Sequence, residues 1–213
     1  MKTFVIGDIH GRADLLNAAL ARIYTSADEG TSIFLGDYVD RGPESKAVLD
    51  TLMAGPQHRS GWSWIFIRGN HEDMLLDCHK SDSSEHQWWV GHGGETTLAS
   101  FGGDIPDSYL MWLSELPRLH WDDHRVYTHA GVSESYSLSE QPESITQWYR
   151  YPHGADVGWN GKHVVHGHTP IGPEQYTNRT NLDGKAYKYG SLFVGVFDDD
   201  QAGGPIEIMN ISI

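Results

Sequence analysis

Two carboxylates and an arginine lie within one short glycine-bounded segment, Gly36–Gly42, in the order Asp37, Asp40, Arg41. The segment follows an apolar run at 33–35, so we expect a buried strand that ends in a sharp turn. A carboxylate can hold two divalent cations with its two oxygens, and a guanidinium fits the oxygens of a phosphate. Taken alone, the segment could also be a structural turn with a local Asp–Arg ion pair.

Four more loops of this kind follow apolar runs along the chain. Glycines beside them allow the backbone to turn sharply and to bring side chains from separate strands together. Carboxylates, imidazoles and one amide carbonyl form the ligand set of a two-metal site for Mn, Fe or Zn rather than for Ca or Mg alone. Over the five loops, the polar side chains are Asp8 and His10; Asp37, Asp40 and Arg41; Asn70 and His71; His129; and His168.

The elements that must position these loops alternate between strand and helix over the first third of the chain. This order predicts a partly parallel sheet, with functional loops at the carboxyl ends of its strands. The periodicity of apolar residues predicts strands at 3–6, 32–35 and 62–67 and helices at 13–27 and 45–53.

The rest of the chain contains less regular patterns. Residues 81–119, rich in Trp, Gly and His, predict a helical insertion, and the polar stretch at 133–147 predicts a surface loop. Apolar runs at 192–197 and 206–213 predict late antiparallel strands that belong to a second sheet. Without any low-complexity linker, the 213 residues predict a single domain.

Composition restricts the function classes. The formal net charge of −14 argues against general binding to nucleic acid or to an anionic membrane, because both are held mainly by clustered Lys and Arg. The single cysteine, Cys78, excludes an internal disulfide and suits a reducing compartment. The apolar run at the amino terminus is too short for a signal peptide, so we expect a soluble, cytoplasmic protein.

The motif series GDIHG, GDYVDRG, GNHE, HAG and GHT resembles the metal-dependent phosphoprotein phosphatase family of calcineurin-like metallophosphoesterases. It is most similar to the small bacterial and lambda-phage serine/threonine phosphatases. The resemblance runs from Lys2 to about Gly190 and includes the pattern GG-x-x-TL-x-S-[FY]-G at 93–102. It implies a four-layer α/β/β/α sandwich with two metals at the strand ends between the sheets.

The resemblance also implies a role for each matching residue. Asp37 would bridge two divalent ions, with Mn²⁺ favoured and Fe or Zn as alternatives. In the family the last ligand is the histidine of an RAH or GH pair, which selects His168 and leaves His166 as a supporting or packing residue. The implied metal ligands are Asp8, His10, Asp37, Asn70, His129 and His168; the acid pair is His71 with Asp40; and the phosphate-binding groups are Arg41, Asn70 and Arg150.

Together these features predict a phosphomonoesterase acting on phosphoserine and phosphothreonine in proteins, with phosphotyrosine left open. Hydrolysis would proceed by direct attack of a metal-bridging hydroxide. His71 would protonate the leaving alkoxide, and Asp40 would favour its charged form. Nucleases and phosphodiesterases on this scaffold typically carry GHxH, whereas Pro170 stands two residues after His168.

Two other hypotheses remain open. A symmetrical diadenosine tetraphosphate hydrolase would share the five motifs, although such enzymes are generally longer than 213 residues. A non-catalytic binding protein on a phosphatase fold is disfavoured because every ligand position is filled. The substrate would be a phosphoprotein or phosphopeptide, and the oligomeric state is not predicted.

Overall fold

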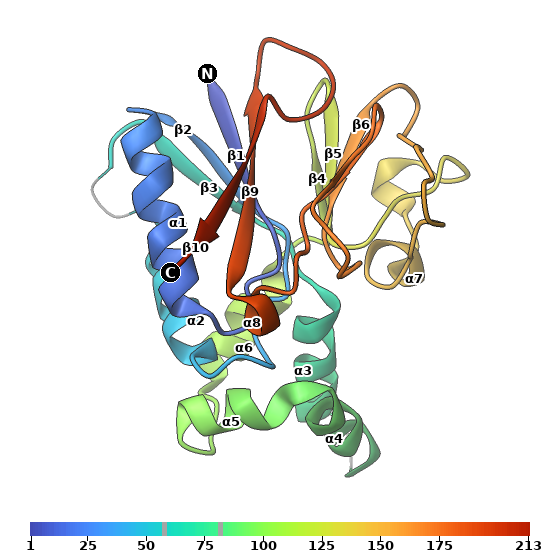
Figure 1. Cartoon of the computed structure of the whole chain (residues 1–213). Helices are drawn as coiled ribbons and strands as arrows, with labels where there is room; N and C mark the ends of the chain where they lie inside the picture. The colour runs from blue at the N-terminus through green and yellow to red at the C-terminus, as the bar shows by residue number, and fades with distance from the viewer. Residues whose placement is uncertain (57–58, 81–82) are drawn as a thin grey trace.

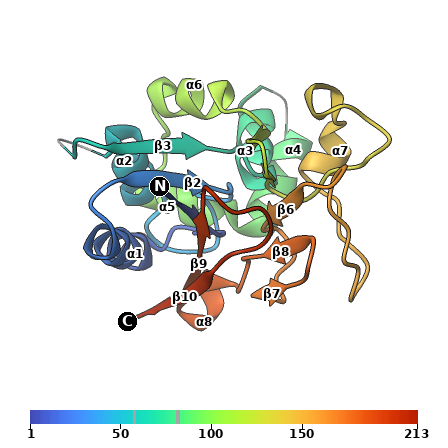
Figure 2. The same cartoon turned by 90° about the horizontal axis from the view of Figure 1, so that it is seen from above.

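Two five-stranded sheets lie face to face in this computed structural model, which describes residues 1–56, 59–80 and 83–213 (Figure 1). The first sheet has the order β10-β9-β1-β2-β3 and the second the order β4-β5-β6-β8-β7. Figure 2 shows α1 and α2 on the side of the first sheet that faces away from the second, α6 beyond the edge strand β3, and α7 beyond the second sheet. The chain therefore forms the predicted four-layer α/β/β/α sandwich.

The predicted alternation of strand and helix is confirmed in the first sheet. Strands β1, β2 and β3 are parallel, with Val5 opposite Ile33 and Ile33 opposite Ile65. The observed bounds are β1 Lys2–Ile6, α1 Ala13–Ser26, β2 Gly30–Phe34, α2 Ser45–Ala54 and β3 Trp62–Phe66.

The late strands correct one prediction. Strands β9 (Ser191–Asp198) and β10 (Glu207–Ser212) are antiparallel as expected, but they extend the first sheet rather than forming a second one. Strand β9 pairs with β1, placing Gly195 opposite Val5. A sequence pattern can predict that a segment forms a strand suited to an antiparallel sheet. Which strand it pairs with depends on the tertiary packing.

The second sheet is built from the short strands that follow the middle of the chain. Its members β5, β6 and β8 are parallel, and β4 and β7 close the two edges in antiparallel pairing. The segment between β5 and β6 contains a 3₁₀ turn, η2, and helix α7. The bounds are β4 Leu119–Trp121, β5 Arg125–Thr128, η2 Leu138–Glu140, α7 Glu143–Thr146, β6 His163–His166, β7 Glu174–Gln175, β8 Arg179–Asn181 and α8 Ala186–Tyr189.

Alternate residues of the central strands face different cores. Along β1, Val5 lies in the cluster between the two sheets, whereas Phe4 and Ile6 face the helices. The same alternation continues in β2, where Ile33 faces inward and Phe34 faces α1 and α2. Both faces of β1 and β2 are thus buried, which explains why these strands read as near-continuous apolar runs.

The helical insertion lies at the carboxyl ends of the first sheet's strands, below the strands in Figure 1. Its first two residues, Ser81 and Asp82, lie outside the described residues. The turn η1 joins α4 to α5 through a kink at Gly93, whose φ of 108° is not helical. The bounds are α3 Asn70–Lys80, α4 Ser83–Trp89, η1 Val90–Gly94, α5 Glu95–Phe101 and α6 Asp107–Glu115.

The predicted surface loop at 133–147 is only partly exposed. Leu138, Thr146 and Gln147 are buried, and Leu138 packs with Val126 and Val164 on the outer face of the second sheet. Serine, glutamate and glutamine dominate the stretch, so the periodicity of apolar residues does not reveal that Leu138 is buried. The stretch therefore contributes the outer helical layer of the second sheet.

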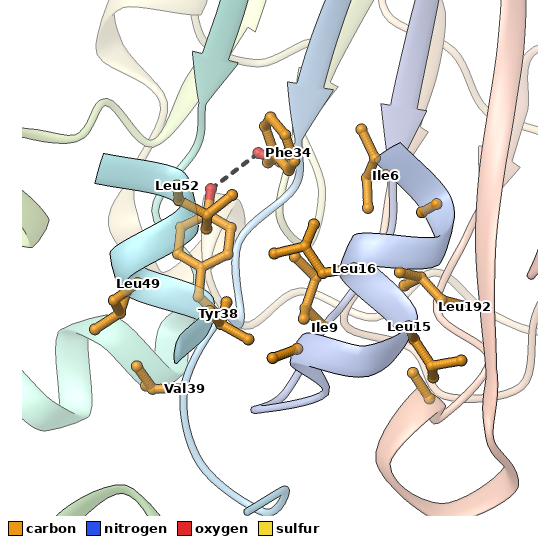
Figure 3. Close-up of a cluster of buried hydrophobic side chains, with 14 of the residues drawn as sticks. Ile6, Ile9, Leu15, Leu16, Phe34, Tyr38, Val39, Leu49, Leu52 and Leu192 are labelled. Atoms are coloured by element: carbon orange, nitrogen blue, oxygen red, sulfur yellow. Dashed lines mark hydrogen bonds between the residues drawn. The ribbon is translucent and has the colours of Figure 1, made fainter. Parts of the chain in front are cut away.

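Tyr38 anchors the loop that follows β2. Its ring is buried in the core formed with α1 and α2, and Figure 3 shows it beside Leu49 and Leu52 with its hydroxyl directed at Phe34. The hydroxyl donates to the carbonyl oxygens of Phe34, at 3.1 Å, and Ile67, at 2.6 Å. One side chain thus ties together the ends of two adjacent parallel strands.

The buried carboxylate of Glu72 holds the same loop from the other side. Its Oε2 accepts the backbone N–H groups of Asp37, at 2.9 Å, and Gly69, at 2.8 Å. Its Oε1 accepts those of Tyr38, at 2.8 Å, and Val39, at 3.3 Å. Burial, followed by the charge of Asp37, raises the pKa of Glu72, and the N–H donors oppose that shift. Because all four partners are donors, the ionised form fits this position.

Glu72→Gln should lower the free energy of unfolding by about 2–4 kcal/mol, because an amide NH₂ would face N–H donors that lose their acceptor. Urea denaturation measures the effect. Glu95→Gln, on the exposed face of α5, is the control and should change stability by less than about 0.5 kcal/mol. Equal stability of the Glu72→Gln variant and the parent chain would show that the carboxylate does not support the loop.

His166 has a structural place in the second sheet. It is fully buried, its Nε2 accepts from Nη1 of Arg179 at 2.7 Å, and its Nδ1 donates to the carbonyl oxygen of Gly167 at 2.9 Å. Arg179 in turn donates to the carbonyl oxygen of Ala155. Burial, followed by the charge of Arg179, lowers the pKa of His166 to about 3. The side chain is therefore a neutral packing group.

Neutral His166 makes stability fall in acid. The unfolded chain takes up a proton on this imidazole below about pH 6.5 and the folded chain does not, so unfolding becomes more favourable as the pH decreases. Between pH 7.5 and 5.5 the contribution of His166 should fall by about 1.4 kcal/mol. Urea titrations at the two pH values should show a smaller pH dependence in His166→Gln than in the parent chain. An unchanged dependence would contradict this assignment.

Candidate functional site

The predicted site residues converge at the carboxyl ends of the parallel strands of both sheets. Five of them adopt backbone conformations with positive φ, between 46° and 69°: His10, Asp37, Asp40, Arg41 and His168. This region costs a non-glycine residue about 1–3 kcal/mol and persists only where surrounding contacts enforce it. Backbone strain is thus concentrated at the residues that the sequence selects for chemistry.

Two glycines permit the loops to approach one another. A Cβ atom at Gly69 would overlap the backbone nitrogen and Oδ1 of Asp37, and one at Gly167 would overlap Oδ1 of Asp8. The backbone N–H of His168 donates to Oδ2 of Asp8 at 3.0 Å. The glycines in the GNHE and GHT motifs are therefore required because carboxylates pack directly against them.

A first group of possible metal ligands surrounds Oδ2 of Asp37. Nε2 of His10 lies 3.3 Å from this oxygen, and Nε2 of His71 lies 3.9 Å from it. Nδ1 of His10 donates to the carbonyl oxygen of Val39 at 2.8 Å, so Nε2 carries the lone pair that could bind a cation, and Nη1 of Arg41 lies 2.9 Å from it. Possible ligand atoms of His10, Asp37 and His71 all lie within 4.8 Å of one another.

A second group surrounds Oδ1 of the same carboxylate. Nε2 of His129 lies 3.3 Å from Oδ1 of Asp37, and Asn70 Oδ1 lies 2.8 Å from His129 Nε2 and 3.0 Å from His168 Nδ1. Nδ1 of His129 donates to the carbonyl oxygen of Leu35. Ligand atoms of Asp37, His129 and His168 again lie within 4.8 Å of one another. Asp37 therefore faces both groups, as a bridging ligand would.

The electrostatics of the two groups fit cations. Burial, followed by the charges of Asp183 and Asp37, raises the pKa of Asp8 well above its usual value. Oδ1 of Asp8 is buried and has no hydrogen-bond partner among the described residues. Burial also raises the pKa of Asp37, but His129, His71 and His10 outweigh it, and the net pKa is well below its usual value.

Divalent ions would be held by Asp8, His10 and Asp37 on one side and by Asp37, Asn70, His129 and His168 on the other. Burial, followed by His129, lowers the pKa of His168 to about 3 and keeps its imidazole neutral. Neutral imidazoles with carboxylates suit Mn, Fe or Zn. The geometric grouping includes His71 but not Asp8, so distance alone does not separate a ligand from a neighbouring acid.

His71 and Asp40 form the predicted pair. Nδ1 of His71 donates to Oδ2 of Asp40 at 2.7 Å, and both side chains are buried. Burial lowers the pKa of His71, and it outweighs the opposing effects of Asp37 and Asp40. The prediction that Asp40 favours the charged imidazole is correct in direction, but it does not determine the net shift.

The two arginines occupy different environments. Nη1 of Arg41 lies 2.9 Å from Nε2 of His10, and its guanidinium lies 5.1 Å from the centre of the Tyr187 ring. Arg150 is exposed, and its charge contributes to the low pKa of His168. Arg41 therefore lies beside the first ligand group, whereas Arg150 acts on the second group through its charge.

Four side chains near the predicted groups were not predicted. Asp183 follows β8, a strand that the sequence pattern did not reveal, although its Asp-Gly resembles the other strand-end loops. Tyr187 lies edge-on to His10 at 5.3 Å. Trp89 lies in the predicted helical insertion and Thr97 in the 93–102 pattern, neither with a role assigned from the sequence; both donate to Asp40.

Comparison with known proteins identifies the family. The model of the calcineurin-like phosphoesterases matches residues 1–183. A serine/threonine-protein phosphatase 1 of Salmonella typhimurium is 27% identical over 183 residues, which are 79% of this chain and 78% of that protein. A symmetrical bis(5'-nucleosyl)-tetraphosphatase of Janthinobacterium sp. is 29% identical over 69% of this chain and 52% of that protein.

An asymmetrical bis(5'-nucleosyl)-tetraphosphatase of Bacillus mycoides is 26% identical over 90% of this chain and 89% of that protein. The symmetrical tetraphosphatase is longer than this chain, as expected from the sequence, whereas the asymmetrical one is of similar length, so chain length does not exclude every tetraphosphatase. Among solved structures, a cold-active protein-tyrosine phosphatase of a Shewanella species superposes with a TM-score of 0.67 at 17% identity, over 99% of this chain and 80% of that chain.

None of the described helices is long and apolar enough to cross a membrane. The fold, the two ligand groups that share Asp37 and the match over residues 1–183 agree with one another. The chain belongs to the calcineurin-like phosphoesterase family.

Proposed function

We propose that the protein is a dimetal phosphomonoesterase that hydrolyses phosphoserine and phosphothreonine in proteins. The observation that supports this most directly is the buried His71–Asp40 pair, with Nε2 of His71 directed to the Asp37 carboxylate between the two ligand groups. An alkoxide is a poor leaving group, so its departure benefits from a positioned acid by about 10²–10⁴-fold. The Salmonella phosphatase relative supports the same substrate class.

Divalent ions bound by the two groups would lower the pKa of water and neutralise the charge of the phosphoryl group. Arg41 and Arg150 would bind the phosphate oxygens, and Asn70 would orient one of them. The acid would be the imidazolium form of His71: its Nδ1 proton is held by Asp40, so the proton given to the leaving oxygen would be the one on Nε2. Exposed Trp148, beside His168, leaves this side of the site open to a peptide.

The second candidate is hydrolysis of a dinucleoside tetraphosphate. It is favoured by the tetraphosphatase relatives and by the position of Trp148, whose ring lies 6.0 Å from that of His168 and could stack on a base. A phosphoanhydride has a better leaving group than an alkyl ester and depends less on an acid such as His71. The intact acid pair is the reason for placing this candidate second.

Substrate preference distinguishes the two candidates. We expect Mn²⁺-loaded protein to hydrolyse a phosphoserine peptide with kcat/KM at least about tenfold above that for diadenosine tetraphosphate. Initial rates over a range of both substrates, with phosphate release and nucleotide chromatography as readouts, measure the ratio. A preference for the dinucleotide would overturn the protein phosphatase assignment and leave the metal-site assignment in place.

Two substitutions distinguish the role of a proton donor from that of a metal ligand. His71→Asn should retain both ions and lower kcat on the phosphoserine peptide by about 10²–10⁴-fold, because the proton donor is lost. Asp37→Ala should abolish metal binding, because both ligand groups lose their shared carboxylate. Metal content per chain, measured after dialysis, is the control readout. Loss of an ion from His71→Asn would make His71 a ligand, and an unchanged kcat would refute its role as acid.

A further inference from the structure

The carboxylate of Asp40 is held by more than His71. Asp40 is fully buried, and Nε1 of Trp89 donates to its Oδ2 at 2.9 Å and approaches Oδ1 at 3.1 Å. The hydroxyl of Thr97 donates to Oδ1 at 2.7 Å. With Nδ1 of His71 on Oδ2, three side-chain donors from three segments surround one carboxylate. The orientation of this group is therefore determined on both oxygens.

Thr97 also holds the backbone of Asp40. The N–H of Asp40 donates to Oγ1 of Thr97 at 2.8 Å and approaches Oγ of Ser45 at 3.1 Å. A single hydroxyl thus accepts from the backbone and donates to the side chain of the same residue, whose φ is +69°. Because that backbone conformation is unfavourable for an aspartate, it requires such external contacts.

The irregular helical segment that carries Trp89 and Thr97 brings both donors to the loop that contains Asp40. Trp89 ends α4, Thr97 lies in the first turn of α5, and the kink at Gly93 between them, with φ of 108°, lets both side chains reach Asp40. A Cβ at Gly94 would overlap the Trp89 ring, and the carbonyl oxygen of Gly93 accepts the N–H of Arg41 at 3.2 Å.

We propose that Trp89 and Thr97 are positioning residues for protonation of the leaving group. They hold Asp40 in the orientation in which it fixes His71, so that Nε2 of His71 faces the substrate. This inference rests on the proposed phosphomonoesterase function. It assigns the α4–η1–α5 segment to the chemical step, whereas packing alone would explain only the burial of Trp89.

The nature of the leaving group distinguishes positioning from packing. Release of a serine alkoxide needs a proton, whereas 4-nitrophenolate leaves as a stable anion and gains little from an acid. A misplaced His71 therefore slows hydrolysis of a phosphoserine peptide more than that of 4-nitrophenyl phosphate. General damage to the site, or loss of a metal, slows both substrates to a similar extent.

The test compares kcat for the two substrates in Mn²⁺-loaded protein. Thr97→Val keeps the shape of the side chain and removes the hydroxyl, and Trp89→Phe removes the indole N–H. Each should lower kcat on the phosphoserine peptide by about tenfold or more and kcat on 4-nitrophenyl phosphate by less than about twofold. Thr97→Ser, which retains the hydroxyl, should restore the parent ratio. Metal content should be unchanged throughout.

Ser100→Ala is the matched control, because Ser100 lies one turn further along α5 and its hydroxyl donates to the carbonyl oxygen of Thr97 rather than to Asp40. It should leave the ratio of the two kcat values unchanged. Equal losses on both substrates, or no loss, in a folded Thr97→Val or Trp89→Phe protein would overturn the inference and leave the proposed function intact. A parent chain that hydrolyses neither substrate would refute the proposed function, and the inference with it.

Discussion

Burying four carboxylates within one group of loops is the constraint on which the rest of the structure depends. Asp8, Asp37, Asp40 and Glu72 are all buried, and an ionised carboxylate removed from water needs donors or cations. Glu72 receives four backbone N–H groups, and Asp40 receives three side-chain donors. Asp37 lies among three histidines, and Asp8 retains an oxygen without a partner among the described residues. The need for further donors or cations is therefore greatest at Asp8 and Asp37, where divalent ions would bind.

The burial of these carboxylates also explains why the loops adopt unfavourable backbone conformations. Parallel strands deliver their carboxyl ends to one edge of each sheet, but bringing Asp37 and His168 within reach of one another requires turns with positive φ. Tyr38 and Glu72 enforce the turn after β2 through buried hydrogen bonds. The helices below the strands thus contribute stability to the strained loops as well as a boundary to the site.

The metal ligands do not by themselves define the substrate. Proteins named as phosphatases and as tetraphosphatases both match this chain over most of its length, so a shared scaffold carries more than one reaction. The groups that treat an ester and an anhydride differently are those that serve the leaving group and those that contact the rest of the substrate. In this chain we propose His71 with its supporting segment for the first task and the exposed aromatic residues 148–149 for the second.

The sequence by itself determined the parallel strands, the five loops and the residue types of the site, because apolar periodicity and glycine-bounded polar motifs are local signals. It did not place β9 and β10 in the first sheet, since the pairing partner of a strand depends on packing between distant segments. Nor did it reveal that burial outweighs Asp40 in the pKa of His71. Only the tertiary structure brought Trp89 and Thr97 to Asp40 and placed Asp183 where its charge raises the pKa of Asp8, because these partners are far apart in the sequence and a local pattern carries no information about such contacts.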